Sequence, residues 1–327
     1  MITLNESATR STLRRILLAL LPPLVVDIIR HARRRTKMQQ AMPPPAKQVA
    51  PATPVVEDGS AASSLYAGAP EWEMVPDADA AWTAHAGWAH ESIVASQLKK
   101  WPSFLKSVEG TRPLGQSHEA AADAPADYAT HNTIMTFGYA LARATGERQK
   151  ISILDWGGGL GQYYVYSRAL MPALPLEYVV KDLPGFCVAG ESLLPAVKFV
   201  SDEGEALARS YDFVFASSSL HYTRDYYGLL GRLCASAGEW LMLTRMPFVE
   251  RSDDFLVVQR PYIYGYLTEY PGWFTNRTRV LDFVSARGFD LERQFLVAEL
   301  PNVPNAPEQA HYYGFLFRRS NFGGRSS

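Results

Sequence analysis

The sequence predicts an α/β fold with a mostly parallel sheet, and three observations support this. An apolar run at residues 151–154 leads straight into a glycine-rich turn at 157–161. Apolar runs then alternate with helical patterns toward the C-terminus, as in successive strand–helix–strand units. The chain has 327 residues, of which 47% are hydrophobic and 20% charged. It is therefore long enough to bury one sizeable core, as a soluble globular protein does.

The first 65 residues divide into a basic, apolar arm (1–41) and a linker (42–65). Within the arm, basic residues flank the apolar run 16–29 across the segment 13–37. At about 1.5 Å per residue the run reaches only about 21 Å, short of the roughly 30 Å hydrocarbon core. We expect a peripheral membrane anchor. An arm that packs on the body or on a second subunit of a homo-oligomer, and a signal peptide, are the alternatives. The linker is too rich in Pro and Ala to build a core.

Residues 66–148 are expected to form a helical cap. Tryptophans fall here in stretches of helical period, and Pro102 is expected to break one helix. Residues 131–144 form the clearest helix, and Gly146 lies just past its end as a C-cap. Because these helices precede the sheet, we expect them to cover a cofactor cleft.

Spacing decides which cofactor the glycine turn suits. A dinucleotide fingerprint needs a glycine where this chain has Gln162, and a Walker loop needs a lysine that is absent. The chain instead reads Asp-x-Gly-x-Gly-x-Gly from Asp155 to Gly161. This pattern resembles motif I of the class I S-adenosylmethionine (SAM) methyltransferases. A glycine turn without a ligand is the alternative interpretation.

The resemblance implies a set of cofactor-binding residues. Asp182 stands at the carboxyl end of the second strand, 176–182. A carboxylate there accepts the ribose hydroxyls of adenosine in nucleotide-binding α/β folds. The Asp-Leu-Pro run beginning at Asp182 is similar to the ribose-binding step of many SAM O-methyltransferases. A helix N-cap is the alternative for Asp182. Asp202, at the tip of the third strand, is expected near the adenine. The expected SAM-binding residues are Asp155, Gly157, Gly158, Gly159, Gly161, Asp182, Leu183, Asp202 and Ser217.

The remaining elements continue the α/β pattern. Strands are expected at 197–200, 211–216, 239–244, 295–299 and 312–318, and helices at 162–170, 225–235 and 279–287. The resemblance implies a Rossmann-like class I methyltransferase domain over 149–320. Its seven strands would have the order 3-2-1-4-5-7-6, with an antiparallel last hairpin.

The segment 245–274 is longer than a plain strand–helix connection needs. We expect its loops to build the pocket for the methyl acceptor, with an aromatic core patch as the alternative. This segment, the glycine turn and residues 217–222 resemble a family of uncharacterised bacterial class I methyltransferases associated with surface-polysaccharide genes. In that family a glutamate stands where this chain has Lys181, so the ribose contact would fall to Asp182. Family membership names no substrate, and the acceptor is expected to be a small molecule or a glycan.

Methyl transfer from SAM mainly requires positioning and desolvation of the acceptor. A hydroxyl acceptor also benefits from a general base. His221, at the end of the fourth strand, is the first candidate, with Tyr262 and Glu269 in reserve; the alternative for His221 is to orient the acceptor loop. The fourth strand is followed by no Asp/Asn cluster, so no metal site is expected.

Two other functional classes compete with this reading. A non-catalytic SAM-fold subunit of a biosynthetic complex would keep the fold, although the intact glycine turn argues against it. Gln162 argues against a nicotinamide-dependent enzyme. The body lacks the basic excess of a nucleic-acid binder, and the two cysteines, Cys187 and Cys234, suit a reducing cytoplasm.

Overall fold

The structure is a computed structural model and describes residues 69–76, 78–84, 87–115 and 126–320. All of these lie within the unit Val56–Ser327. The expected arm and linker, residues 1–65, lie outside the described residues, so the membrane anchor stays a prediction. No helix in the described part of the chain is long and apolar enough to cross a membrane.

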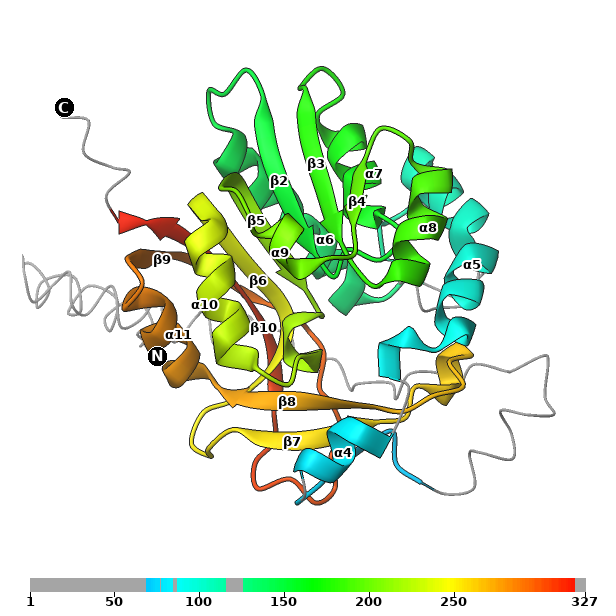
Figure 1. Ribbon diagram of the computed structural model, residues 1–327, viewed down its shortest axis with the longest axis vertical. Coiled ribbons are helices and arrows are strands. Elements are labelled where there is room, and N and C mark those ends of the chain that lie inside the picture. The colour runs from blue at the N-terminus through cyan, green and yellow to red at the C-terminus, as the bar shows by residue number, and fades with distance from the viewer. Residues whose placement is uncertain (1–68, 77, 85–86, 116–125, 321–327) are drawn as a thin grey trace, which may run out of the picture. The chain divides into compact units, whose positions relative to one another are not determined.

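Seven strands form the central sheet, and their order is the predicted one. Along the sheet they run β4-β3-β2-β5-β6-β10-β9. The first five are parallel, and β10 is antiparallel to both of its neighbours (Figure 1). Numbered in chain order, this is 3-2-1-4-5-7-6, the Rossmann-like order expected for a class I methyltransferase. The strands are β2 (Ile151–Trp156), β3 (Leu176–Lys181), β4 (Lys198–Val200), β5 (Tyr211–Ser217), β6 (Ala237–Val249), β9 (Phe289–Leu296) and β10 (His311–Arg319).

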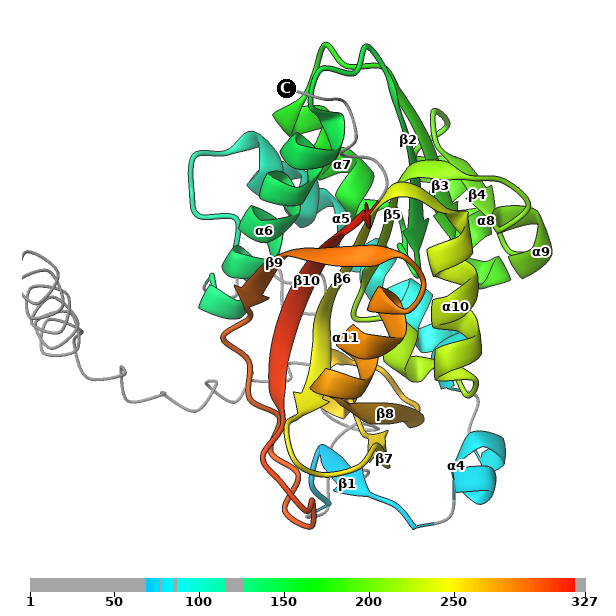
Figure 2. The ribbon, with the colours of Figure 1, turned by 90° about the vertical axis from the view of Figure 1, so that its left-hand side faces the viewer.

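Helices cover both faces of this sheet. In Figure 2, α6 and α7 lie on one side of the sheet and α10 and α11 on the other. Residues 153, 213 and 215 of the strands belong to the first core, and residues 154, 214 and 216 belong to the second. This alternation is the period of a strand that is buried on both faces. The helices are α4 (Ala78–Ala84), α5 (Glu91–Glu109), α6 (Tyr128–Thr145), α7 (Gln162–Leu170), α8 (Pro184–Leu193), α9 (Glu203–Ala206), α10 (Tyr226–Ser236) and α11 (Arg277–Ser285).

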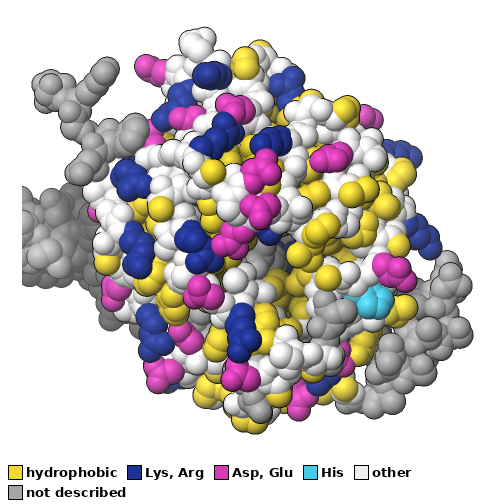
Figure 3. Space-filling model, in the orientation of Figure 1, with side chains coloured by type: hydrophobic (Ala, Val, Ile, Leu, Met, Phe, Trp, Pro, Cys, Tyr) yellow, Lys and Arg dark blue, Asp and Glu magenta, His cyan; other side chains and the backbone are white. Residues whose placement is uncertain are grey.

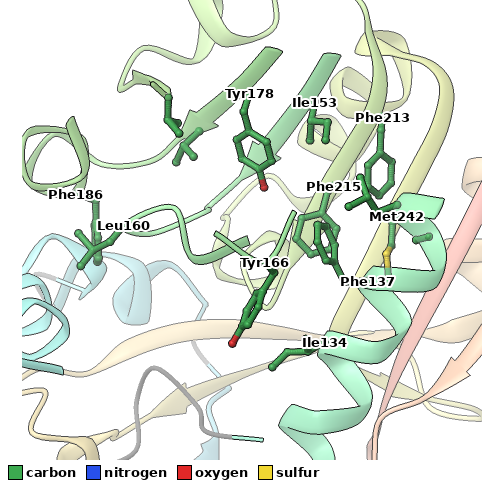
Figure 4. Close-up of a cluster of buried hydrophobic side chains, with 14 of the residues drawn as sticks. Ile134, Phe137, Ile153, Leu160, Tyr166, Tyr178, Phe186, Phe213, Phe215 and Met242 are labelled. Atoms are coloured by element: carbon green, nitrogen blue, oxygen red, sulfur yellow. The ribbon is translucent and has the colours of Figure 1, made fainter. Parts of the chain in front are cut away.

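Aromatic rings dominate the first core. Phe137 of α6 packs against Phe213 and Phe215 of β5, with ring centroids 4.9 Å apart in the pair Phe137–Phe215 (Figure 4). All three side chains are fully buried. Burial of each contributes roughly 1.5–3 kcal/mol, so α6 is held firmly over the centre of the sheet.

Most expected bounds differ from the structure by three residues or fewer, and two expectations were clearly wrong. Pro102 lies inside α5 rather than at a break. An internal proline costs about 3 kcal/mol, and burial of the adjacent Trp101 and Phe104 offsets that cost. The sixth strand of the expected order lies at 289–296 rather than 295–299. It is an edge strand whose side chains are mostly exposed, so its sequence lacks the apolar pattern of a buried strand.

The segment 245–274 is not a set of loops, as expected, but largely strand. β7 (Phe255–Gln259) and β8 (Tyr270–Asn276) pair antiparallel, and β1 (Trp72–Met74) adds to the outer edge of β7. β8 also joins the parallel sheet, because β6 extends beyond the end of β5 and pairs with β8 there. The short 3-10 turn η3 (Tyr262–Tyr264) connects β7 to β8, whereas η1 (Gly87–Ala89) lies between α4 and α5 and η2 (Leu220–Tyr222) lies between β5 and α10. This three-stranded extension continues the sheet from the carboxyl end of β6 in the order β8-β7-β1.

Candidate functional site

The glycine turn joins β2, the central strand of the parallel order, to α7. Gly157 has a φ of 70°, and a Cβ there would lie 2.3 Å from the Cβ of Ser219. At Gly158 a Cβ would lie 2.6 Å from the carboxyl group of Asp155. Both positions therefore require glycine, for conformation or for space. The result is a length of bare backbone that faces a cavity.

Asp182 fixes this turn to the end of β3. Its carboxylate accepts hydrogen bonds from the backbone N–H groups of Gly159 and Leu183, both at 2.7 Å. Burial raises the pKa of Asp182, and the two backbone hydrogen bonds act in the opposite direction. Asp182 is therefore a group that orders the loop as well as one that lines the cavity.

Asp155 lies beneath the turn rather than in the cavity wall. It is 1% exposed and accepts a hydrogen bond from the Tyr178 hydroxyl at 2.9 Å. Burial, the largest cause, raises its pKa to about 7. A carboxyl group poised to ionise near neutral pH lies directly under the backbone that the resemblance assigns to SAM.

The cavity has a volume of about 230 Å³ and opens at the carboxyl ends of the parallel strands. Trp88, Tyr163 and Tyr222 supply aromatic walls, and helices α5 and α6 supply Gln97 and Thr133. Ligands bind at this edge in open α/β sheets. The expected residues that line it are Gly157, Gly158, Gly159, Asp182, Leu183 and Ser217.

The cavity wall also contains two unusual backbone conformations. Among the described non-glycine residues, Ser218 and Arg245 are those with positive φ, at 51° and 53°. Such conformations cost on the order of 1–3 kcal/mol and cluster at functional sites. Ser218 follows β5 and Arg245 lies in β6, and both line the cavity. Beside them the Ser217 hydroxyl and the Tyr163 hydroxyl are hydrogen-bonded at 3.0 Å.

The expected catalytic residues do not line the cavity. His221 is 1% exposed, its ring lies against Tyr222 with centroids 3.9 Å apart, and neither ring nitrogen has a hydrogen-bond partner among the described residues. Burial, reinforced by Arg245, lowers its pKa to about 3. The imidazole is therefore neutral, but it is a weak base and is screened from the cavity by its neighbour.

Tyr262 and Glu269 act together at a different place. The Tyr262 hydroxyl donates a hydrogen bond to Glu269, and Arg260 forms an ion pair with the same carboxylate at 3.3 Å. Arg260 also pairs with Glu73 of β1 at 2.7 Å. These contacts hold the three-stranded extension together, which explains the polar residues in this segment without a catalytic role.

Two expected cofactor residues also lie away from the cavity wall. Asp202 caps α9, where it accepts a hydrogen bond from the Glu205 N–H at 2.7 Å. Gly161 has a φ of 89°, and a Cβ there would lie 2.7 Å from the Leu194 side chain. Its glycine is required for packing between the turn and the chain that follows α8.

Sequence reasoning missed part of the cavity wall. Trp88, Gln97 and Thr133 come from the helical part of the chain, far from the glycine turn in sequence. Their positions depend on how α5 and α6 pack, which no local pattern reveals. Tyr163 carried a usable signal, because it is the second residue of the helix that the turn begins. Lys181 lines the cavity too, with its ammonium 5.0 Å from the Trp156 ring centroid.

No family model and no curated protein matches this chain. Solved structures of low identity are similar to it. The 1,6-didemethyltoxoflavin-N1-methyltransferase of Burkholderia thailandensis is 15% identical, over 57% of this chain and 78% of that one, with a TM-score of 0.37. A SAM-dependent methyltransferase of Clostridium acetobutylicum is 11% identical, over 60% and 93%, with a TM-score of 0.39. The mitomycin 7-O-methyltransferase MmcR is 13% identical, over 73% and 80%, also at 0.39. At these identities and TM-scores the likeness assigns no substrate and no residue role.

The described residues near the turn have the chemistry that a sulfonium amino acid with a nucleoside requires. Bare glycine backbone offers close approach, Asp182 offers carboxylate oxygens, and Asp155 places a second acid below the turn. A metal site would need a different set of ligating side chains. The described part of the chain contains no group of three His, Cys, Asp or Glu side chains that would hold a metal ion.

Proposed function

We propose that this protein is a SAM-dependent methyltransferase that acts on a hydroxyl group of a small molecule or a glycan. One observation carries the proposal. A bare glycine turn, tied to the end of β3 by Asp182, opens on a cavity at the carboxyl edge of a sheet with the order 3-2-1-4-5-7-6. The sequence resembles bacterial methyltransferases associated with surface-polysaccharide genes, and its cysteines suit a reducing cytoplasm. A cytoplasmic glycan precursor is therefore the first acceptor to test.

The residues divide into a donor side and an acceptor side. The backbone of Gly157–Gly159 would lie along the methionine part of SAM, and the remaining lone pairs of Asp182 would accept the ribose hydroxyls. Asp155 would stabilise the positive charge of SAM from below the turn. Ser217 lies between the two sides, at the end of β5. These roles go to the expected residues that the cavity geometry favours, and not to Asp202 or Gly161.

The chemistry depends on position and on exclusion of water. SAM supplies an activated methyl group, so the chain must hold the acceptor oxygen in line with it. Aromatic walls from Trp88, Tyr163 and Tyr222 remove water from around the acceptor. Among the described residues, those that line the cavity include no histidine. We therefore assign catalysis to orientation and desolvation, with no role for His221, Tyr262 or Glu269 as a base that touches the acceptor.

Calorimetric titration of the full chain with SAM and with NADH tests the donor side. We expect SAM to bind and NADH not to bind. Asp182→Ala should weaken SAM binding by about 1–3 kcal/mol through lost charge-assisted hydrogen bonds. SAM affinity equal to that of the wild type would show that the cofactor site is misplaced.

The alternative is a non-catalytic SAM-binding subunit of a biosynthetic complex. Both proteins would bind SAM, so titration does not separate them. The acceptor pools do: deletion of an enzyme should leave a lipid-linked or nucleotide-linked glycan one methyl group lighter, as mass spectrometry would detect. If deletion removes the whole glycan and no methylated species exists in the wild type, the scaffold reading is correct.

A further inference from the structure

Strand β6 breaks its alternation where it reaches the cavity. Its pairing with β10 places two residues, Thr244 and Arg245, opposite the single residue Gly314. Leu243 and Met246 accordingly pack in the same core, although they lie three positions apart. This is a β-bulge, a feature that occurs next to active sites and redirects a side chain.

The bulge determines where Arg245 lies. In an unbroken strand residue 245 would follow residues 241 and 243 into the core beneath α10 and α11. Instead, the positive φ at Arg245 lets its side chain line the cavity, where it is 17% exposed. The neighbouring end of β5 adopts the same conformation, and there Ser218 donates its N–H to the Thr244 carbonyl at 3.0 Å. The end of β5 and the bulge within β6 thus depart from regular geometry at the same wall of the cavity.

Glu299 orients the guanidinium group. It accepts a hydrogen bond from Nε of Arg245 at 2.9 Å and a longer one from Nη2 at 3.5 Å. Glu299 lies between β9 and β10, so its contact with the Nε edge sets the direction of the planar group. Arginine held in one orientation suits a planar or tetrahedral anion, since it offers several N–H donors in a fixed geometry.

We propose that Arg245 recognises an anionic group of the acceptor, a carboxylate or a phosphate. The acceptor is then an acidic sugar or another acidic small molecule. This inference rests on the proposed function, because it names the substrate class of the same site. The sheet order favours the acceptor over SAM as the source of the anion: β6 is separated by β5 from β2, which carries the glycine turn.

Paired probes test this inference on the full chain. Each pair holds one acid and one neutral analogue: D-glucuronate and D-glucose, glucose 6-phosphate and glucose, 4-hydroxybenzoate and 4-hydroxybenzamide. Titrations are run with and without S-adenosylhomocysteine. We expect the wild type to prefer the acid of at least one pair by about 10-fold or more, as a charge-assisted hydrogen bond allows. The preferred pair tells carboxylate from phosphate.

Single-residue variants test whether Arg245 causes the preference for the acid over the neutral analogue. Arg245→Gln should abolish it, and Arg245→Lys should keep part of it. The matched control is Arg260→Gln, because Arg260 is also 17% exposed and ion-paired but does not line the cavity. It should keep the full preference. Circular dichroism confirms that the variants are folded.

Several results would overturn the inference. They are a wild type without any acid preference, a preference that survives Arg245→Gln, and an equal loss in Arg260→Gln. A fourth is a loss of affinity for SAM in Arg245→Gln that decarboxylated SAM does not show, because the anion would then belong to the methyl donor. Failure of the wild type to bind SAM would instead refute the proposed function, and the probes without cofactor would still report on Arg245.

Discussion

At the scale of single residues, Asp155 shows how burial turns a motif position into a titrating group. The carboxyl group is 1% exposed, and its pKa is raised from the ordinary 3.8 to about 7. Between these two pH values the folded protein holds a proton that the unfolded chain has released. The stability of the ligand-free protein should therefore fall as the pH rises from about 4 to about 7.

Binding of SAM should reverse this protonation. The positive charge of SAM above the turn favours the Asp155 carboxylate, so binding near pH 6.5 should release a proton and affinity should rise toward pH 8. Calorimetric titration in buffers of different ionisation enthalpy measures the number of protons released on binding. The Asp155→Asn variant should bind SAM more weakly and release a smaller fraction of a proton on binding. The Asp202→Asn variant, which changes a helix cap outside the cavity wall, should match the wild type in both quantities. Heat that is independent of the buffer in the wild type would contradict the assignment.

His221 gives a second prediction at this scale. Because the ring lies behind Tyr222 and its nitrogens have no partner among the described residues, His221→Leu should leave SAM affinity unchanged. Turnover should fall by less than about 10-fold, compared with the roughly 10²–10⁴-fold loss expected for a general base. A loss in the larger range, with SAM affinity intact, would restore His221 as the base and show that Tyr222 moves during the reaction.

The residue scale also shows what the sequence could predict. Spacing alone predicted Gly157 to Gly159 and Asp182 as one site, and the structure places them in the wall of one cavity, because the turn and the next strand end meet at one sheet edge. It was less informative for Asp202 and Glu269. Acidic residues at strand ends and in connections serve equally well as helix caps and ion-pair partners, and only packing distinguishes these uses.

At the scale of elements, the glycine turn is the piece most sensitive to change. Gly158→Ala would place a Cβ 2.6 Å from the Asp155 carboxyl carbon, so the turn or Asp155 must shift. We expect SAM affinity to fall at least 10-fold, a change of about 1.4 kcal/mol. Gly185→Ala, in the first turn of α8, is the control. Its Cβ would make an ordinary 3.6 Å contact with the Val94 side chain of α5. Equal SAM binding by both variants would mean that Asp155 is not coupled to the site.

Element prediction succeeded where periodicity was strong and failed where tertiary contacts decide. The helix 162–170 matches α7 residue for residue, because a glycine turn begins it and an apolar face defines it. The segment that holds β7 and β8 is predicted from the sequence to form loops, and it is strand because it pairs with β1 and β6. Tyr270 of β8 is a core residue: it is 1% exposed and stacks on Trp88 with centroids 4.6 Å apart. The segment therefore packs against a residue that lines the cavity.

At the scale of the whole molecule, charge is divided unevenly along the chain. Residues 1–47 carry nine Lys or Arg against Glu6 and Asp27, a net charge of +7, whereas the whole chain has −1. The remainder is therefore acidic overall. On the face that Figure 3 shows, acidic and basic side chains are interspersed, and an area of apolar side chains lies over α8. The basic excess of the sequence therefore lies in residues 1–47.

This division leads to a prediction about membranes. The run 16–29 is too short to span a bilayer, and Arg33, Arg34 and Arg35 follow it. Each basic residue near an anionic surface contributes about 1 kcal/mol, screened by salt. We expect the full chain to sediment with anionic liposomes at low salt and to be released at high salt. Replacing the three arginines with alanine should weaken binding by up to about 100-fold. Arg251→Ala, which removes an arginine whose side chain is 87% exposed on the body, should bind like the wild type. Equal sedimentation of the triple variant and the wild type would assign the arm to contacts with protein instead.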